Sequence, residues 1–120
     1  MRENIIKEKS FNFAIRITKL YKYLIEEKKE YVLSKQLLRS GTAIGALIRE
    51  AKQAESKPDF FHKLAIALKE ANETNYWLEL LKKSDFPDNS QFISINTDCE
   101  ELLKLLTSIV KTSKKTIDNG

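Results

Sequence analysis

Residues 56–81 read SKPDFFHKLAIALKEANETNYWLELL and decide the fold. The stretch opens with a helix start signal: Ser56 can cap the first turn, Pro58 suits that turn, and Asp59 completes a variant of the capping box. Mostly apolar residues then recur at spacings of three and four: Phe61, Leu64, Leu68, Ala71, Asn75 and Leu78. This pattern is typical of a helix packed on other helices. The stretch predicts a long helix over 57–83 with one side buried in a bundle.

Three more amphipathic segments accompany this helix. The spacing of apolar residues predicts helices over 10–27, 32–55 and 90–115, with a start near residue 4 as the alternative for the first. The connections are short, apart from the turn-rich segment 84–89, and short connections favour antiparallel neighbours. The chain, with only three Gly and two Pro, is therefore predicted to be all-α: one domain over 1–120, an antiparallel up-down-up-down four-helix bundle.

The predicted core follows the apolar stripes of these three helices. Its members outside 57–83 are Phe13, Ile17, Leu20, Leu24, Leu37, Gly41, Ile44, Ile48, Ala51, Phe92, Ile95, Cys99, Leu102, Leu106 and Ile109. Gly41 and Gly45 stand one turn apart among small residues, and each costs about 1 kcal/mol of helix propensity relative to alanine. Such a segment predicts close approach of a neighbouring backbone or a bulky side chain. The alternative is a break at Ser40–Gly41 that gives two shorter helices.

Charge is distributed unevenly along the chain. Residues 1–52 carry twelve Lys or Arg and six Glu, a net charge of +6, whereas residues 53–103 carry five Lys and ten Asp or Glu, a net charge of −5. Either the oppositely charged helices pair with one another, or the basic half faces a polyanion. Pairing between helices is the favoured interpretation, because bundles commonly alternate charge in this way.

Residues capable of catalysis or metal binding are sparse. His62 is the only histidine and Cys99 the only cysteine, and Cys99 falls on an apolar stripe. The Glu-x-x-His pairs of di-iron bundles do not occur, since Glu70 is followed three residues later by Glu73. We expect no enzyme activity, no metal and no cofactor. We also expect no signal peptide and no membrane span, which needs roughly 20 apolar residues, and a cytoplasmic location.

Basic residues on the first two helices are the strongest functional lead. They form one stripe on each helix and are the candidate nucleic-acid-binding residues: Lys9, Arg16, Lys19, Lys35, Arg39 and Arg49. Cations in such stripes bind phosphates and position nucleic acid without reading its sequence. The alternative is pairing with the acidic third helix or with carboxylates four residues away, as Lys22 can pair with Glu26.

Three residues on the third helix are candidates for an oligomer interface or for fixing helix register. Glu70 lies beside the apolar seam and needs a cationic partner if it is covered, with Arg16, Arg39 and Arg49 as candidates. Asn75 resembles the single polar seam residue that sets register in coiled coils. Trp77 is interpreted as an interface anchor rather than a base-stacking platform.

Two segments resemble a known family. SGTAIGALIREA (40–51) and DFFHKLAIALKEANETNYWLELL (59–81), with SFNFAIRITKLYKYL (10–24) and YVLSKQLLRSG (31–41), resemble proteins encoded within intervening sequences of bacterial large-subunit ribosomal RNA genes. That family is similar in architecture to the accessory protein of diversity-generating retroelements, a basic pentameric barrel. The resemblance implies a four-helix bundle, a ring-shaped homo-oligomer with five subunits, and RNA or DNA as a partner. Leu47 and Arg49 depart from the family pattern, which often has Asn at the first of these positions.

The sequence thus predicts a non-enzymatic, homo-oligomeric helical bundle. Its leading function is binding of structured RNA or DNA through basic patches repeated around a ring. The alternative is a protein–protein scaffold or accessory subunit with no direct nucleic-acid contact.

Overall fold

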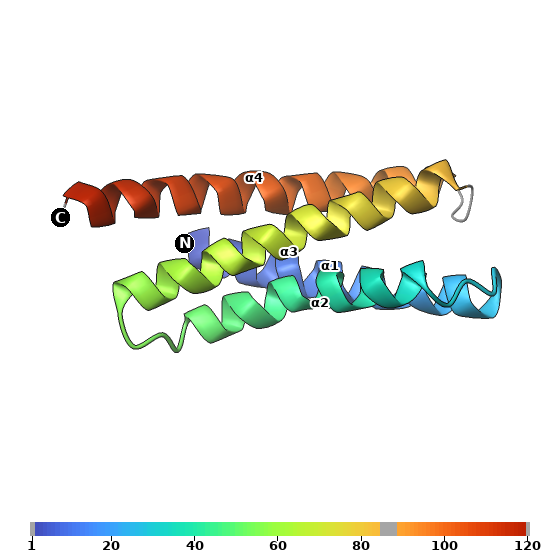
Figure 1. Ribbon diagram of the computed structural model, residues 1–120, viewed down its shortest axis with the longest axis horizontal. Coiled ribbons are helices and arrows are strands. Elements are labelled where there is room, and N and C mark those ends of the chain that lie inside the picture. The colour runs from blue at the N-terminus through green and yellow to red at the C-terminus, as the bar shows by residue number, and fades with distance from the viewer. Residues whose placement is uncertain (1, 85–88, 120) are drawn as a thin grey trace.

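The computed structural model describes the backbone of residues 2–84 and 89–119 and the side chains of residues 4–84 and 90–112. This part of the chain forms four helices, α1 (Arg2–Glu26), α2 (Leu33–Ala51), α3 (Lys57–Lys83) and α4 (Asn89–Asn119). Helices that follow one another pack together, and α4 also packs against α1 (Figure 1). The α1–α2 connection lies at the same end of the bundle as the end of α3 and the start of α4. The predicted all-α four-helix architecture is confirmed.

The helix bounds differ from the predicted ones mainly at two places. α1 begins at Arg2, close to the alternative start near residue 4 and not at residue 10, because no helix breaker precedes Ser10 and Ile6 is buried in the core. α2 ends at Ala51 rather than at residue 55, since the N–H groups of Gln53 and Ala54 bond carbonyls three residues earlier and form tight turns. α3 has the predicted bounds, α4 continues to Asn119, and the predicted turn at 84–89 lies largely outside the described residues.

The start of each central helix is capped by a side chain. Ser56 Oγ accepts the N–H of Asp59 at 3.2 Å, so the predicted cap of α3 is present. At α2 the cap is Glu30, which was not predicted from the sequence: its Oε1 accepts the Leu33 N–H at 2.9 Å and its Oε2 accepts the Ser34 N–H at 2.7 Å. The preceding residue, Lys29, adopts the left-handed conformation with φ of 54°, which turns the chain from α1 into α2.

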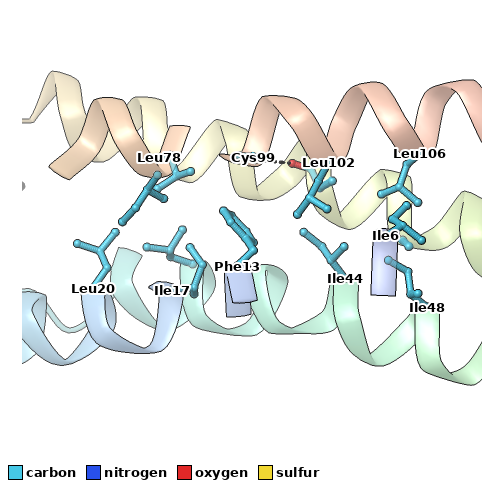
Figure 2. Close-up of a cluster of buried hydrophobic side chains, with 14 of the residues drawn as sticks. Ile6, Phe13, Ile17, Leu20, Ile44, Ile48, Leu78, Cys99, Leu102 and Leu106 are labelled. Atoms are coloured by element: carbon cyan, nitrogen blue, oxygen red, sulfur yellow. Dashed lines mark hydrogen bonds between the residues drawn. The ribbon is translucent and has the colours of Figure 1, made fainter. Parts of the chain in front are cut away.

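The core runs along the bundle axis and draws on all four helices. Figure 2 shows Phe13 of α1 in the middle of this cluster, with Ile44 of α2 and Leu102 of α4 nearby. Every core residue predicted on α1, α2 and α4 is buried. The buried side chains of α3 are Leu64, Ala67, Ala71, Thr74, Leu78 and Leu81.

The buried face of α3 is rotated from the predicted one. Phe61, Leu68 and Asn75 are only partly buried, whereas Ala67, Thr74 and Leu81 are at most 1% exposed. The seam therefore contains Thr74 as its polar residue, and the prediction that Asn75 occupies the seam is wrong. Thr74 Oγ1 and Ser40 Oγ share a hydrogen bond of 2.9 Å, which joins α3 to α2 inside the core.

Small residues in α2 allow its neighbours to come close. A Cβ atom added to Gly41 would lie 2.8 Å from Cγ2 of Ile17, so the α1 side chain occupies the space that any other residue would need. The corresponding atom on Gly45 would lie 3.4 Å from the Ser10 carbonyl oxygen, an ordinary contact. α2 is one continuous helix through both glycines, so the alternative of a break at Ser40–Gly41 is wrong.

The two glycines give a matched pair of variants. Gly41→Ala should destabilise the protein by about 1 kcal/mol, because overpacking costs about 1–3 kcal/mol and improved helix propensity returns about 1 kcal/mol. Gly45→Ala should stabilise it by about 0.5–1 kcal/mol. Urea unfolding followed by circular dichroism measures both. Equal effects of the same sign would show that contact with Ile17 does not constrain Gly41.

Glu30 should make stability depend on pH. Burial alone would raise the pKa of Glu30, but the N–H groups of Leu33, Ser34 and Val32 hold it below its ordinary value. A lowered pKa contributes stability that is complete at neutral pH and is lost as pH falls through the folded-state pKa. Glu30→Gln should therefore cost about 1 kcal/mol at pH 7, and its difference from the parent should vanish in acid. Glu27→Gln, which removes the same charge nearby, should not reproduce this pattern in unfolding experiments across pH.

Candidate nucleic-acid interface

Two of the candidate basic residues pair with acidic residues of α4. Lys9 Nζ lies 2.9 Å from Glu101 Oε1. Arg16 donates from Nη1 to Asp98 Oδ2 at 2.6 Å and from Nη2 to Ser94 Oγ at 2.9 Å. Both pairs bridge the seam between α1 and α4 and are partly exposed. These cations therefore pair with the fourth helix, whereas the alternative interpretation of the basic stripes predicted partners on the third helix or four residues away.

A third candidate, Arg39, is the cationic partner of Glu70. Arg39 Nη1 lies 3.1 Å from Glu70 Oε2, and its Nη2 also contacts Glu73 Oε2. Trp77 Nε1 donates to the same Glu73 oxygen at 2.9 Å. A network of four side chains thus links α2 to two turns of α3 on the outside of the bundle. Of the three candidate partners of Glu70, the structure selects Arg39.

The predicted interface residues of α3 separate onto two sides of that helix. Glu70 and Trp77 belong to the Arg39 network, next to α2. Asn75 instead donates from Nδ2 to Glu79 Oε1 at 3.5 Å, and its buried Oδ1 has no hydrogen-bond partner among the described residues. Tyr76, which is 57% exposed and packs edge-on against Trp77, enlarges the aromatic surface beside the network. Asn75 would therefore lie at the edge of an oligomer interface that was centred on Trp77 and Tyr76.

The remaining candidates, Lys19, Lys35 and Arg49, lie on exposed positions of α1 and α2. None of them forms an ion pair with a carboxylate in the part of the chain that the structure describes. Arg49 lies over the ring of Phe11, with its guanidinium carbon 4.8 Å from the ring centroid. Lys22 likewise forms no ion pair with Glu26 or any other described carboxylate. The charge of these cations is therefore available to a ligand.

The contact between Arg49 and Phe11 defines a surface that we call the α1–α2 face. On α1 it continues from Phe11 through Ile15 to Lys22, and on α2 it continues from Arg49 back to Lys35, because residues three, four or seven apart share one side of a helix. Ion pairs cross the α1–α4 and α2–α3 seams, but among the described residues none crosses between α1 and α2. The only carboxylate of α2, Glu50, points toward Lys63 of α3. By the same spacing Glu8 and Glu26 also lie on this face, and neither forms an ion pair among the described residues. The α1–α2 face therefore carries unpaired charges of both signs beside the ring of Phe11.

Cys99 has the chemistry of a core residue rather than of a nucleophile. Burial, with smaller contributions from Glu100 and Asp98, raises the pKa of the Cys99 thiol to about 12. Its Sγ lies 3.7 Å from the Ala71 carbonyl oxygen, shown as a dashed line in Figure 2. Over the described residues no group of three His, Cys, Asp or Glu side chains could hold a metal ion. No described helix is long and apolar enough to cross a bilayer.

Comparison with known proteins agrees with the resemblance seen in the sequence. The family model described as 23S rRNA-intervening sequence protein matches residues 2–108. A crystal structure of a protein of unknown function, from the S23 ribosomal protein family of Bacteroides thetaiotaomicron VPI-5482, superimposes with a TM-score of 0.90. The two chains are 59% identical over 92% of this chain and 99% of that one. No curated protein matches the sequence.

The Arg39 network can be followed through the single tryptophan of the chain. Glu73→Ala should move the emission maximum of Trp77 to longer wavelength, because the indole N–H loses its carboxylate acceptor and turns to water. It should also cost about 0.5–1 kcal/mol of stability, the range for exposed ion pairs. Glu8→Ala, at an exposed position on α1 and outside the network, should change neither quantity. An unchanged spectrum in Glu73→Ala would mean that the Trp77–Glu73 bond does not persist in solution.

Proposed function

This chain belongs to the family of 23S rRNA-intervening sequence proteins, and we propose that it is a non-enzymatic, homo-oligomeric bundle that binds structured RNA or DNA through the α1–α2 face. One observation carries the proposal: the cations of this face lack carboxylate partners among the described residues, whereas Lys9, Arg16 and Arg39 on the neighbouring seams are paired. Of the six candidate residues, Lys35 and Arg49 are thus the ones assigned to the phosphate backbone. Cytoplasmic location is part of the same proposal.

The dimensions and chemistry of the α1–α2 face suit a nucleic-acid backbone. Lys35 and Arg49 are 14 residues apart on one helix, about 21 Å at 1.5 Å per residue. That length spans about six phosphates of one strand at 3.4 Å each. Arg49 is held over Phe11, so part of its side-chain freedom is already lost before binding. Contacts of this kind fix position on the backbone and carry no sequence information.

Assembly would multiply this modest charge. Each subunit contributes only a few available cations, and repetition around a closed ring would combine them into a strong field. The exposed Tyr76 beside Trp77 supplies an aromatic surface of the kind that anchors protein interfaces. A pentamer, and the similarity to the accessory protein of diversity-generating retroelements that suggests it, stay predictions.

A second candidate function is a protein–protein scaffold with no direct nucleic-acid contact. The observation that favours it is the grouping of Arg39, Trp77 and Tyr76 on the outer α2–α3 side, since Arg, Trp and Tyr are the residues most enriched at binding hot spots. On this alternative, the α2–α3 side would bind another protein. The cations of the α1–α2 face would then serve subunit contacts.

Salt-dependent binding distinguishes the two candidates. Fluorescence anisotropy with a labelled RNA hairpin and a DNA duplex should show affinity that falls steeply with salt. Replacing both Lys35 and Arg49 by Gln should weaken binding to both probes and reduce the salt slope by about one for each phosphate that is no longer neutralised. Lys69→Gln, on the exposed outer side of α3, is the control and should have at most a small effect.

Three outcomes would count against parts of the proposal. Absence of binding by the parent protein at low salt would reject nucleic-acid binding and leave the scaffold function. Equal weakening in Lys69→Gln and the α1–α2 variants would reject the α1–α2 face as the binding surface. A monomeric mass in native mass spectrometry would reject the ring.

A further inference from the structure

A cavity of about 310 Å³ opens between α1 and α4. It lies at the end of the bundle where α1 finishes and α4 begins (Figure 1). α1 and α4 are the least closely packed of the adjacent helix pairs, which explains why space remains there. The lining residues are Arg16, Lys19, Leu20, Tyr23, Gln91 and Ile95. The volume is at the lower limit of typical small-molecule sites, about 300 Å³.

Two cations stand at this cavity, and only one of them is neutralised. Arg16 is held by Asp98 and Ser94, so its guanidinium plane is fixed toward the seam. Lys19 is exposed and has no carboxylate partner among the described residues. A third cation, Lys28, has its Nζ 6.0 Å from the centroid of the Tyr23 ring. The cavity mouth is therefore electropositive.

The inner wall is apolar and aromatic. Leu20 and Ile95 are each 4% exposed and belong to the hydrophobic core, so they form an apolar floor. Tyr23 is partly buried and lines the cavity beside them. Gln91 adds an amide that can both donate and accept hydrogen bonds. An aromatic surface, an adaptable amide and an unpaired ammonium group together fit a ligand with a flat polar ring and a negative group.

A second cavity on the same seam provides an internal comparison. It measures about 170 Å³ and is lined by Lys9, Asn12, Phe13, Asp98, Glu101 and Leu102. There Glu101 neutralises Lys9, and Asp98 adds a further carboxylate. Because Glu101 pairs with Lys9 and Asp98 pairs with Arg16, the smaller cavity has no unpaired cation in its lining, whereas the larger one has Lys19.

We propose that the larger cavity binds a single nucleotide, with its base against Tyr23 and its phosphate at Lys19 and Arg16. Base stacking on aromatic side chains is worth about 1–3 kcal/mol and tolerates any base. The same chemistry is offered by a free nucleoside monophosphate and by an unstacked nucleotide of a single-stranded RNA. This site does not require the α1–α2 face to bind nucleic acid, because Lys35 and Arg49 lie beyond its lining.

Nuclear magnetic resonance of the full chain, labelled with ¹⁵N, tests the site. Adenosine monophosphate should perturb the amides of the lining residues, adenosine should perturb the same amides more weakly, and inorganic phosphate should perturb mainly those near Lys19. Lys19→Gln should weaken the nucleotide about tenfold and leave adenosine unchanged, whereas Tyr23→Leu should weaken both ligands. Lys69→Gln and Tyr31→Leu, both at exposed positions away from the cavity, are the matched controls.

Each outcome bears on the proposal. Nucleotide shifts confined to the lining residues, weakened in Lys19→Gln and Tyr23→Leu and kept in the controls, support it. Shifts seen only with a short single-stranded RNA, on the same lining residues, also support it and assign the ligand to RNA. Absence of shifts with every probe, or equal weakening in the controls, overturns it. A further result to look for is a protein with both Lys35 and Arg49 replaced that loses binding to RNA hairpins and still binds the nucleotide. That result would support the cavity site independently of the α1–α2 face.

Discussion

The close approach of α1 and α3 to the middle of α2 is the constraint on which the rest of the structure depends. Ile17 fills the space over Gly41, and Thr74 hydrogen-bonds with Ser40 from the opposite side. A larger residue at either α2 position would push a neighbouring helix outward. Because packed helices move as rigid units, these central contacts also fix which side chains meet on the outside of the bundle.

Charge pairing follows from that geometry. The seams of α1 with α4 and of α2 with α3 bring basic helices beside carboxylates, and the described ion pairs between helices lie there. α1 and α2 are both basic, so their shared face has no such partners among the described residues. The segregation of charge in the sequence therefore produces ion pairs on two seams, and that a polyanion faces the basic half stays a prediction. Each exposed ion pair contributes only about 0–1 kcal/mol to the free energy of unfolding. These pairs therefore act mainly to fix how the helices are aligned with one another.

The two candidate sites lie on different seams of α1, with α2 and with α4, and suit different kinds of recognition. The α1–α2 face is open and carries cations spaced along a helix, which suits an extended row of phosphates. The α1–α4 cavity is smaller and combines Lys19 with the ring of Tyr23, which suits one nucleotide. At the cavity Arg16 already donates to Asp98 and Ser94, so Lys19 supplies the unpaired positive charge there.

The sequence by itself determined the four helices, the cap at Ser56 and the buried stripes of α1, α2 and α4, because each of these three helices carries one unbroken series of small or apolar residues at three- and four-residue spacings. It could not determine the rotation of α3, where two overlapping series share Leu64, Ala71 and Leu78 and apolar residues surround most of the helix. Only contact with the small residues of α2 selected the series that contains Thr74. Tertiary structure also decided that Arg39 is the partner of Glu70, because a helical pattern orders residues along one helix and contains no distance to another.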